Sequence, residues 1–456
     1  MKNIYIIGAM ACLLSACKPS VNITTPPSAG DVDFTNYMAI GNSLTAGYAD
    51  NSLTVSGQLN SYPQRLFEQF SLVGAKGPFI QPLLVSDIGY PGPKKVMGYT
   101  YGYCTHDTSM GPVDYPTWVS EPRDAETYLS GVNNNQINNV AVPGIRVVDY
   151  PVAGYASAFN PYAKRFYKDP SKRPLDELQY RVSNLSPTFF TMWMGANDVL
   201  GYATAGGQGD GTGNASPSIP GFNLYNNNDI SPIKAFTDNY DSILRVARSS
   251  GADGALINIP DVTSIPFFTT VPANGLTLTR QGQVDSLQAL YARAGFDKVF
   301  QLGANYFIVQ DHNGNTRQAV PGELILLTVP QDSIKCKGWG SIKPIPAQYV
   351  LTTDELQNIR NNTKLMNEII KARSVREHLA YVDMNTYLGT ISKGITYNGI
   401  KYTAEYVTGG AFSLDGVHLT PRGYALVANE ILRTINEFYH ATIPYTDVNK
   451  YPGIKF

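Results

Sequence analysis

Short apolar runs divide this chain, and longer stretches with helical spacing lie between them. The apolar runs cover residues 37–41, 137–142, 188–194, 254–259 and 380–384. Runs of this length and composition are typical of buried strands. Strands that alternate with helices form a parallel sheet covered by helices on both faces. The pattern therefore predicts an α/β fold, organised as a three-layer α/β/α sandwich around a five-stranded parallel sheet.

Helical spacing is clear in six stretches. They cover residues 62–70, 175–182, 233–248, 287–294, 353–378 and 420–438. Thr353 is the candidate N-cap of the long stretch that follows it. Thr420 is the candidate N-cap of the last stretch, and Pro421 occupies its first helical position, where proline is favoured.

Two long stretches interrupt this alternation. Residues 73–135 and 266–350 lack a clear core pattern, although residues 306–309 and 324–329 are candidate strands of a small addition. Loops of this length are commonly functional. We therefore expect one folded domain over residues 34–440 with these two insertions, followed by a C-terminal tail over residues 441–456.

The N-terminal residues resemble a sorting signal. Lys2 precedes an apolar stretch, residues 4–14, that is too short to span a bilayer. It ends in Leu14-Ser15-Ala16-Cys17, which resembles the processing box of bacterial lipoproteins. The resemblance predicts a signal peptide over residues 1–16 and a lipid-modified Cys17. The alternatives are an ordinary signal peptide and an N-terminal membrane anchor.

The residues that follow the signal predict a flexible tether. Residues 17–33 are rich in Pro, Ser, Thr and Gly, and contain few apolar side chains that could pack. No later stretch has the ~18 continuous apolar residues of a spanning helix. We therefore expect the protein in the bacterial cell envelope, held at the outer membrane by its lipid and facing either the periplasm or the surface.

Charge and cysteine content limit the partners. The chain has 35 basic and 36 acidic residues, a balance that does not favour nucleic-acid binding. Besides Cys12 and Cys17, the cysteines are Cys104 and Cys336. In an oxidising compartment these two are a candidate disulfide, and the alternative is two separate buried thiols. His106 lies close to Cys104, but the spacing matches no closed zinc set, so we expect no metal site.

A serine follows the first apolar run. Residues 37–41 lead into Asn42-Ser43-Leu44, a small-residue turn before a helix. Open α/β sheets bind ligands at the carboxyl ends of their strands. The amino end of the next helix also favours a developing negative charge. Ser43 is therefore a candidate nucleophile.

An acid and a base share one loop near the other end of the chain. Asp415 precedes His418 by three residues, and a Thr-Pro helix start follows them. This pair supplies a general base and the carboxylate that orients it. The alternative is that His418 is a structural residue, one of five histidines.

Together these motifs resemble the four blocks of the SGNH (GDSL-type) hydrolase family, in the family's order. The blocks contain Ser43, Gly144, Asn197 and the Asp415/His418 pair. The first block reads Gly-Asn-Ser-Leu instead of Gly-Asp-Ser-Leu, and this change keeps the nucleophile. The resemblance implies a flavodoxin-like strand order and a serine esterase without a cofactor.

The resemblance also implies a role for each residue. Ser43 is the nucleophile, His418 the base and Asp415 the residue that orients the base. The oxyanion is held by the backbone N–H groups of Ser43 and Gly144 and by the side-chain amide of Asn197. The structural alternatives are a plain strand-to-loop turn at Gly144 and a turn-forming side chain at Asn197. Asp198 is expected to cap a helix or hold a loop, with no chemical role.

Substrates of the family include lipids, aryl esters and acetylated sugars. We therefore expect a small ester, a lipid or an acylated carbohydrate as substrate. A rival interpretation is a non-catalytic lipoprotein that binds glycan or lipid on a hydrolase fold, because fold alone does not establish activity. The intact set of Ser43, Gly144, Asn197, Asp415 and His418 argues against that rival.

Overall fold

The computed structural model describes residues 26–100, 113–118, 134–219, 224–293, 295 and 300–454. The predicted signal peptide, Cys17, Cys104 and His106 lie outside these residues. Within the described ranges, no helix combines the length and the apolar character needed to cross a membrane.

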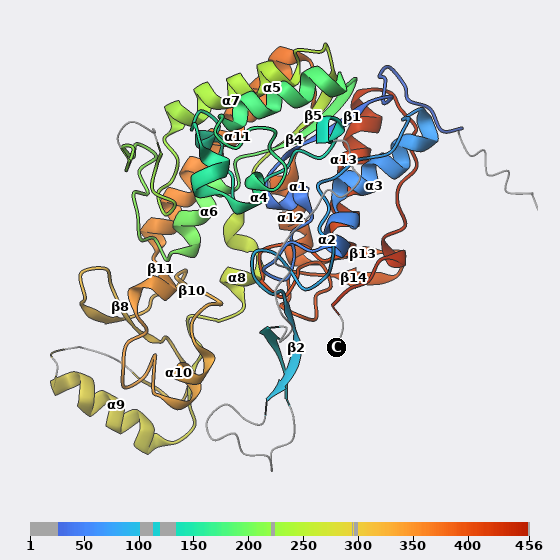
Figure 1. Cartoon of the computed structure of the whole chain (residues 1–456). Coiled ribbons are helices and arrows are strands. Elements are labelled where there is room, and N and C mark those ends of the chain that lie inside the picture. The colour runs from blue at the N-terminus through green and yellow to red at the C-terminus, as the bar shows by residue number, and fades with distance from the viewer. Residues whose placement is uncertain are drawn as a thin grey trace, which may run out of the picture.

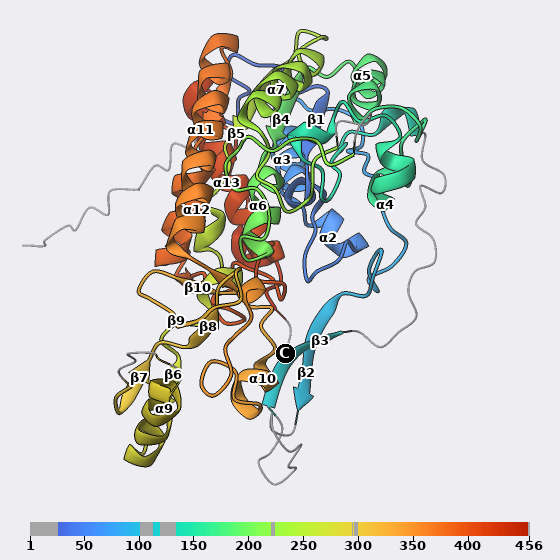
Figure 2. The ribbon, with the colours of Figure 1, turned by 90° about the vertical axis from the view of Figure 1, so that its left-hand side faces the viewer.

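A parallel sheet forms the centre of the molecule (Figures 1 and 2). Its strand order is β1–β4–β5–β12. The strands are β1 (Tyr37–Gly41), β4 (Phe189–Trp193), β5 (Asp253–Ile257) and β12 (Ala380–Val382). All neighbouring pairs are parallel, and every residue of β1 and β4 is buried. Continuous apolar strands fit a sheet that is covered on both faces, so the predicted α/β fold is confirmed.

The prediction of a fifth strand at residues 137–142 is wrong. This segment runs beside β1, where the Ala39 N–H donates to Asn138 O at 2.9 Å, but it forms a single bridge, Ala39 to Asn139, and not a ladder. Two further backbone bonds join it to β1, from the Val140 N–H to Ala39 O at 3.0 Å and from the Val142 N–H to Gly41 O at 3.1 Å. Asparagine side chains add to them: Asn138 Nδ2 donates to Tyr37 O, and Asn139 Nδ2 donates to Thr45 O. The segment therefore lies along β1 with partly side-chain bonding, and its backbone pairing is too short to form a strand of the sheet. The sheet therefore has four strands, with the segment along its β1 edge.

Helices cover both faces of the sheet and form the outer layers (Figures 1 and 2). One layer contains α5 (Pro174–Leu185), α7 (Ile233–Ala247) and α11 (Thr353–Glu377), which pack side by side. The other layer contains α3 (Tyr62–Phe70) and α13 (Pro421–Phe438), which pack against each other. With residues 137–142 at the β1 edge, the order of segments follows the flavodoxin-like 2-1-3-4-5 arrangement.

The structure shows the N-caps of two helices whose starts were predicted from the sequence. The cap of α11 is Thr352 and not Thr353, because Thr352 Oγ accepts the Glu355 N–H at 3.3 Å and Glu355 Oε2 accepts the Thr352 N–H at 2.8 Å. This reciprocal pair is a capping box. The start of α13 is confirmed: Thr420 Oγ accepts the Gly423 N–H at 3.1 Å, and Pro421 is the first helical residue.

Both predicted insertions extend from the same end of the molecule (Figure 2). The first contains the hairpin of β2 (Lys95–Thr100) and β3 (Val113–Trp118). The second contains α9 (Gln281–Arg293), α10 (Gln331–Cys336) and three short antiparallel strand pairs. These pairs are β6 (Leu276–Leu278) with β7 (Gly303–Asn305), β8 (Ile308–Gln310) with β9 (Thr316–Gln318), and β10 (Leu324–Ile325) with β11 (Val350–Leu351). The second insertion also has two small apolar clusters of its own, around Val309 and around Leu287.

Shorter elements complete the described part of the chain. They are α1 (Ser43–Ala46), α2 (Val55–Leu59), α4 (Pro161–Lys164), α6 (Asn197–Thr204), α8 (Pro266–Thr269), α12 (Met384–Lys393), β13 (Ile395–Tyr397) and β14 (Ile400–Tyr402).

The two ends of the described chain pack against each other. The Asp31 N–H donates to Tyr439 O at 2.9 Å, and the Thr442 N–H donates to Ser28 O at 3.0 Å. Val32 and Ile443 are buried in the main core. Residues 26–33, which the sequence placed in the tether, are therefore held on the domain by the C-terminal segment.

Candidate active site

Ser43 is the first residue of α1, directly after β1. Asn42 caps this short helix, since its Oδ1 accepts the Leu44 N–H at 3.2 Å. Gly41 is required at the turn, because a Cβ there would overlap the Thr45 side chain. The N–H at the first helical position has no intrahelical acceptor, so the Ser43 N–H is available to a ligand. The predicted strand–turn–helix context of the serine is confirmed.

The folded chain brings Ser43 to His418 and Asp415, across 375 residues of sequence. Ser43 Oγ lies 2.8 Å from His418 Nε2, and His418 Nδ1 lies 2.9 Å from Asp415 Oδ2. The Tyr48 ring packs against the imidazole, with ring centroids 4.6 Å apart. The three side chains thus form one continuous hydrogen-bonded chain that ends at a serine hydroxyl.

Asp415 is buried, and hydrogen-bond donors surround its carboxylate. Its Oδ1 accepts the Val417 and His418 N–H groups, each at 2.8 Å, and the Ser413 hydroxyl at 3.1 Å. Burial by itself raises the pKa of this carboxyl, but the charge of His418 and the hydrogen bonds outweigh burial and hold the pKa of Asp415 well below its usual value. An ionised Asp415 accepts a hydrogen bond from His418 Nδ1. Nε2 is then left without a proton and can accept the proton of the Ser43 hydroxyl.

Asn197 and Asp198 join the start of α6 to the loop that contains Gly144. Asn197 Nδ2 donates to Ile145 O at 3.0 Å, and Asp198 Oδ2 accepts the Val147 N–H at 2.9 Å. An amide nitrogen carries two hydrogens, so one N–H of Asn197 remains for a ligand. Gly144 is exposed and left-handed, with φ of +82°. Asp198 is fully buried, and burial raises its pKa to about 7. Asp198 therefore holds a loop, which was one of its two expected roles.

A small cavity adjoins the serine. Its volume is about 30 Å³, and Ser43, Asn197 and His418 supply its polar surface together with Asn42. Gly144 is not part of this lining. The rest of the wall is apolar and contains Leu44, Ala196, Leu200, Pro260, Val262, Ile265, Leu388, Phe412, Val417 and Leu419. The reacting group would therefore lie between one polar edge and an apolar wall.

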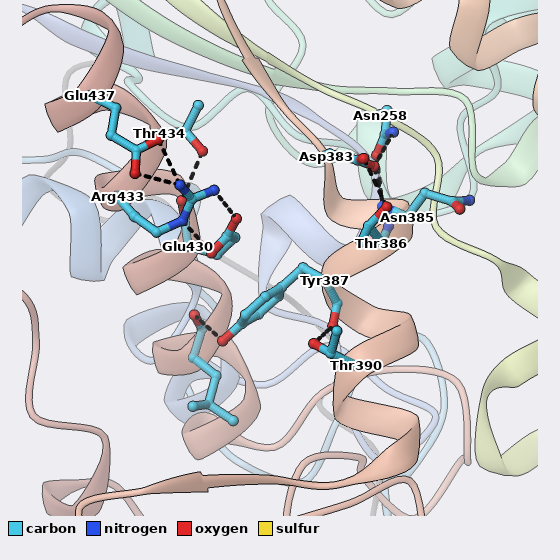
Figure 3. Close-up of polar contacts among 11 residues, drawn as sticks. Asn258, Asp383, Asn385, Thr386, Tyr387, Thr390, Glu430, Arg433, Thr434 and Glu437 are labelled. Carbon is cyan, nitrogen blue, oxygen red and sulfur yellow. Dashed lines mark hydrogen bonds and ion pairs between the residues drawn. The ribbon is translucent and has the colours of Figure 1, made fainter.

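Asparagine side chains hold one side of this wall in place. Figure 3 shows Asn258, after β5, beside Asp383 and Asn385 at the start of α12. Asn258 Nδ2 donates to Asp383 Oδ1, and Asn258 Oδ1 accepts the Asn385 N–H, both at 2.8 Å. Asn385 Nδ2 in turn donates to Ile259 O at 2.9 Å. Because Pro260 and Val262 follow directly, these bonds set the position of the cavity wall.

The sequence did not reveal the residues that support Asp415. The Asn51 N–H donates to Asp415 Oδ2 at 2.9 Å, and Ser413 donates to Oδ1. The Asp-Asn-Ser sequence at 50–52 is a turn signal. Only the fold places this turn against Asp415, 364 residues away in the chain.

Two other predictions concern cysteine and metal. Cys336 is disulfide-bonded, and Cys104 lies outside the described residues, so the pairing of these two stays a prediction. In the described part of the chain, no group of three or more His, Cys, Asp or Glu residues is arranged to hold a metal ion.

One family of known proteins matches the chain over most of its length. The family model of GDSL-like lipases and acylhydrolases matches residues 37–431. No curated protein matches the chain significantly. Among solved structures, the Clostridium thermocellum family 3 carbohydrate esterase is 10% identical, with a TM-score of 0.34 over 90% of this chain and 98% of that one. The Enterococcus faecalis lipase/acylhydrolase is 12% identical, with a TM-score of 0.32 over 90% and 98%.

The Streptomyces rimosus extracellular lipase is likewise 12% identical, with a TM-score of 0.33 over 90% of this chain and all of that one. The family match spans β1, β4, β5 and β12 and all the candidate catalytic and oxyanion residues. The chain therefore belongs to the GDSL-like lipase/acylhydrolase family and is a carboxylic ester hydrolase.

Proposed function

We propose that the protein is a serine esterase that cleaves its substrate through an acyl-enzyme on Ser43. The observation that carries this proposal is the hydrogen-bonded chain from Ser43 Oγ to His418 Nε2 at 2.8 Å and from His418 Nδ1 to Asp415 Oδ2 at 2.9 Å. A serine hydroxyl is a weak nucleophile unless an adjacent base removes its proton. This geometry supplies that base and a carboxylate that orients it.

The reaction proceeds in two halves. Ser43 Oγ attacks the ester carbonyl carbon while His418 Nε2 takes the hydroxyl proton. The tetrahedral intermediate then expels the alcohol, which receives that proton from His418, and the acyl group stays on Ser43. In the second half, water attacks the acyl-enzyme and gives its proton to His418. His418 returns this proton to Ser43 Oγ as the acyl–oxygen bond breaks, which releases the carboxylic acid and regenerates Ser43. Asp415 stabilises the positive imidazole in both halves.

The oxyanion of each intermediate needs preorganised donors. We assign this role to the N–H groups of Ser43 and Gly144 and to the remaining N–H of Asn197. An amide donates a hydrogen bond without a net charge, so it gains most as negative charge develops on the oxygen.

Replacement of Asn197 by alanine should lower kcat on the order of 10²–10³-fold, the usual effect of losing one oxyanion donor. KM should change little, because the bond strengthens only in the transition state. Steady-state kinetics on p-nitrophenyl acetate measure both constants. The matched control is Asn226→Ala, because Asn226 lies in an exposed turn. An unchanged kcat in a folded Asn197→Ala protein would remove Asn197 from the oxyanion site.

The substrate proposed from the cavity is an ester with a short acyl group, such as an acetylated glycan. A volume of about 30 Å³ holds roughly two water-sized groups, enough for the methyl end of a short acyl chain. The kcat/KM should therefore be highest for p-nitrophenyl acetate or propionate. Each further methylene that does not fit should cost roughly 10–200-fold.

A series of p-nitrophenyl esters from acetate to palmitate tests this preference. Leu200→Ala enlarges the cavity and should move the optimum to a longer chain, whereas Leu365→Ala, at a position that is 46% exposed, should not. Fastest turnover of palmitate by the unmodified protein would overturn the short-acyl proposal and favour a lipid substrate.

A fluorophosphonate probe tests the nucleophile directly, because it reacts covalently only with an activated serine. We expect one adduct per chain, on the peptide that contains Ser43, and loss of activity in proportion to labelling. A folded protein with neither labelling nor turnover of any ester would support the rival, a glycan- or lipid-binding lipoprotein. The lipid anchor at Cys17 and the cell-envelope location remain proposals from the sequence.

A further inference from the structure

Two segments from opposite ends of the chain meet behind Asp415. The turn that follows α1 contains Asp50 and Asn51, and the loop before α13 contains Ser413 and Leu414. The Asp50 N–H donates to Ser413 Oγ at 3.0 Å, and Asp50 Oδ1 accepts the Leu414 N–H at 2.9 Å. These bonds join the serine-bearing element to the loop that holds the acid and the base.

The same turn also contacts Asp415 itself. The Asn51 N–H donates to Asp415 Oδ2 at 2.9 Å, on the oxygen that faces His418 Nδ1. Ser413 Oγ, which accepts from Asp50, donates to Asp415 Oδ1 at 3.1 Å. Both oxygens of Asp415 are therefore connected to the turn, one directly and one through Ser413.

The backbone of the turn is unusual. Asp50 and Asn51 are consecutive left-handed residues, with φ of +54° and +64°. This conformation is uncommon outside glycine and persists where surrounding contacts hold it. Here it aims both N–H groups at the 413–415 segment, which is the contact that compensates for the strain.

The charge of the Asp50 carboxylate is a second link between this turn and the catalytic pair. Asp50 is half-buried, and burial raises its pKa to about 6, while the Leu414 N–H opposes this rise and the charge of Asp415 adds to it. Other titratable groups that interact with Asp50 are His418, Lys94, Lys95, Tyr406 and Tyr424. At neutral pH, Asp50 therefore places a second negative charge close to the imidazole.

We propose that Asp50 is a positioning residue for the acid–base pair. Its carboxylate and N–H hold the 413–418 loop so that Asp415 Oδ2 points at His418 Nδ1, and its charge favours the protonated imidazole that forms during the reaction. Asp50 touches neither the substrate nor Ser43, so it acts through Asp415 and His418. This role rests on the proposed serine esterase mechanism.

The side chain can be removed without disturbing the turn. Asp50→Gly retains the left-handed backbone, because glycine adopts positive φ freely, and deletes the carboxylate. Asp50→Asn keeps an oxygen for the Leu414 N–H and removes only the charge. The matched control is Asn398→Gly, another left-handed residue (φ +45°) in the turn between β13 and β14.

Steady-state kinetics of the full-length variants on p-nitrophenyl acetate test the proposal. Asp50→Gly should lower kcat on the order of 10²-fold, the scale of a small misplacement of reacting groups, with KM unchanged. Asp50→Asn should lower kcat by a smaller factor. In both variants the acid limb of the kcat/KM profile should move to lower pH, because losing a nearby negative charge favours the neutral imidazole. Asn398→Gly should match the unmodified protein.

The outcomes separate this inference from the esterase proposal. Normal turnover and Ser43 labelling in the unmodified protein, with an unchanged kcat and pH profile in both Asp50 variants, would overturn the role of Asp50 alone. Absence of labelling and turnover in the unmodified protein would overturn both proposals. If Asp50→Gly fails to fold, the pH profile of Asp50→Asn decides the question, since that variant keeps the hydrogen bond.

Discussion

Replacement of Ser43 by alanine should abolish ester hydrolysis and leave the fold intact. The expected loss in kcat is on the order of 10⁴–10⁶-fold, as in serine hydrolases that lose the nucleophile. The substitution removes one oxygen from a buried position, and the first turn of α1 keeps its Asn42 cap, which uses the Leu44 N–H. The residual rate would come from substrate binding and from the oxyanion donors.

Turnover of p-nitrophenyl acetate and the burst of p-nitrophenol in the first turnover measure this effect. The matched control is Ser71→Ala, at an exposed serine whose hydroxyl bonds Phe67 O at 2.8 Å on the helix surface. A Ser43→Ala protein that retains a burst of normal size would show that another residue carries the acyl group.

Asp415→Asn should lower kcat by about 10⁴-fold, because it reverses the direction of the hydrogen bond to His418. Asp415 Oδ1 accepts three donors, so the amide oxygen of an asparagine must occupy that position. The NH₂ group is then forced into the position of Oδ2, where it faces His418 Nδ1. His418 must accept there and carry its proton on Nε2, and Nε2 can then no longer take the proton of Ser43.

The same geometry predicts a loss of stability in Asp415→Asn. The NH₂ group would also face the Asn51 N–H, which now donates to Oδ2 at 2.9 Å. An unpaired buried donor costs about 1–3 kcal/mol. Kinetics and thermal unfolding check the two effects separately, with Asp169→Asn as the control because Asp169 is partly exposed and bonds Ser171 within its own turn. A kcat within about tenfold of the unmodified value, a factor worth 1.4 kcal/mol, would mean that Asp415 does not orient His418.

Local sequence determined the elements that local physics governs. The runs at 37–41, 188–194, 254–259 and 380–384 were recognisable because strands buried on both faces are continuously apolar, and all four occur in the sheet. The start of α13 was recognisable because a Thr-Pro pair suits the N-cap and the first helical position. The site residues were recognisable from their motifs and their order, which do not depend on distance in the fold.

Other features depend on partners that are remote in the chain. Residues 137–142 look like a strand in sequence, but Asn138 and Asn139 bond β1 and the Thr45 turn through their side chains, and no local pattern indicates this. The N-cap of α11 is one residue earlier than the sequence predicted, because the Glu355 side chain bonds back to Thr352 and completes a capping box. In both cases the apolar pattern is compatible with more than one conformation, and hydrogen bonds of polar side chains select the one that forms.

The sequence by itself therefore determined the fold class and the chemical groups of the site, because apolar periodicity and motif order are properties of short segments. Only the tertiary structure decided how those groups are held and what space the substrate has. The Asp50 turn reaches Asp415 across 364 residues, and the apolar wall beside Ser43 is assembled from five separate parts of the chain. Contacts of this kind arise when the whole core packs, so no local pattern encodes them.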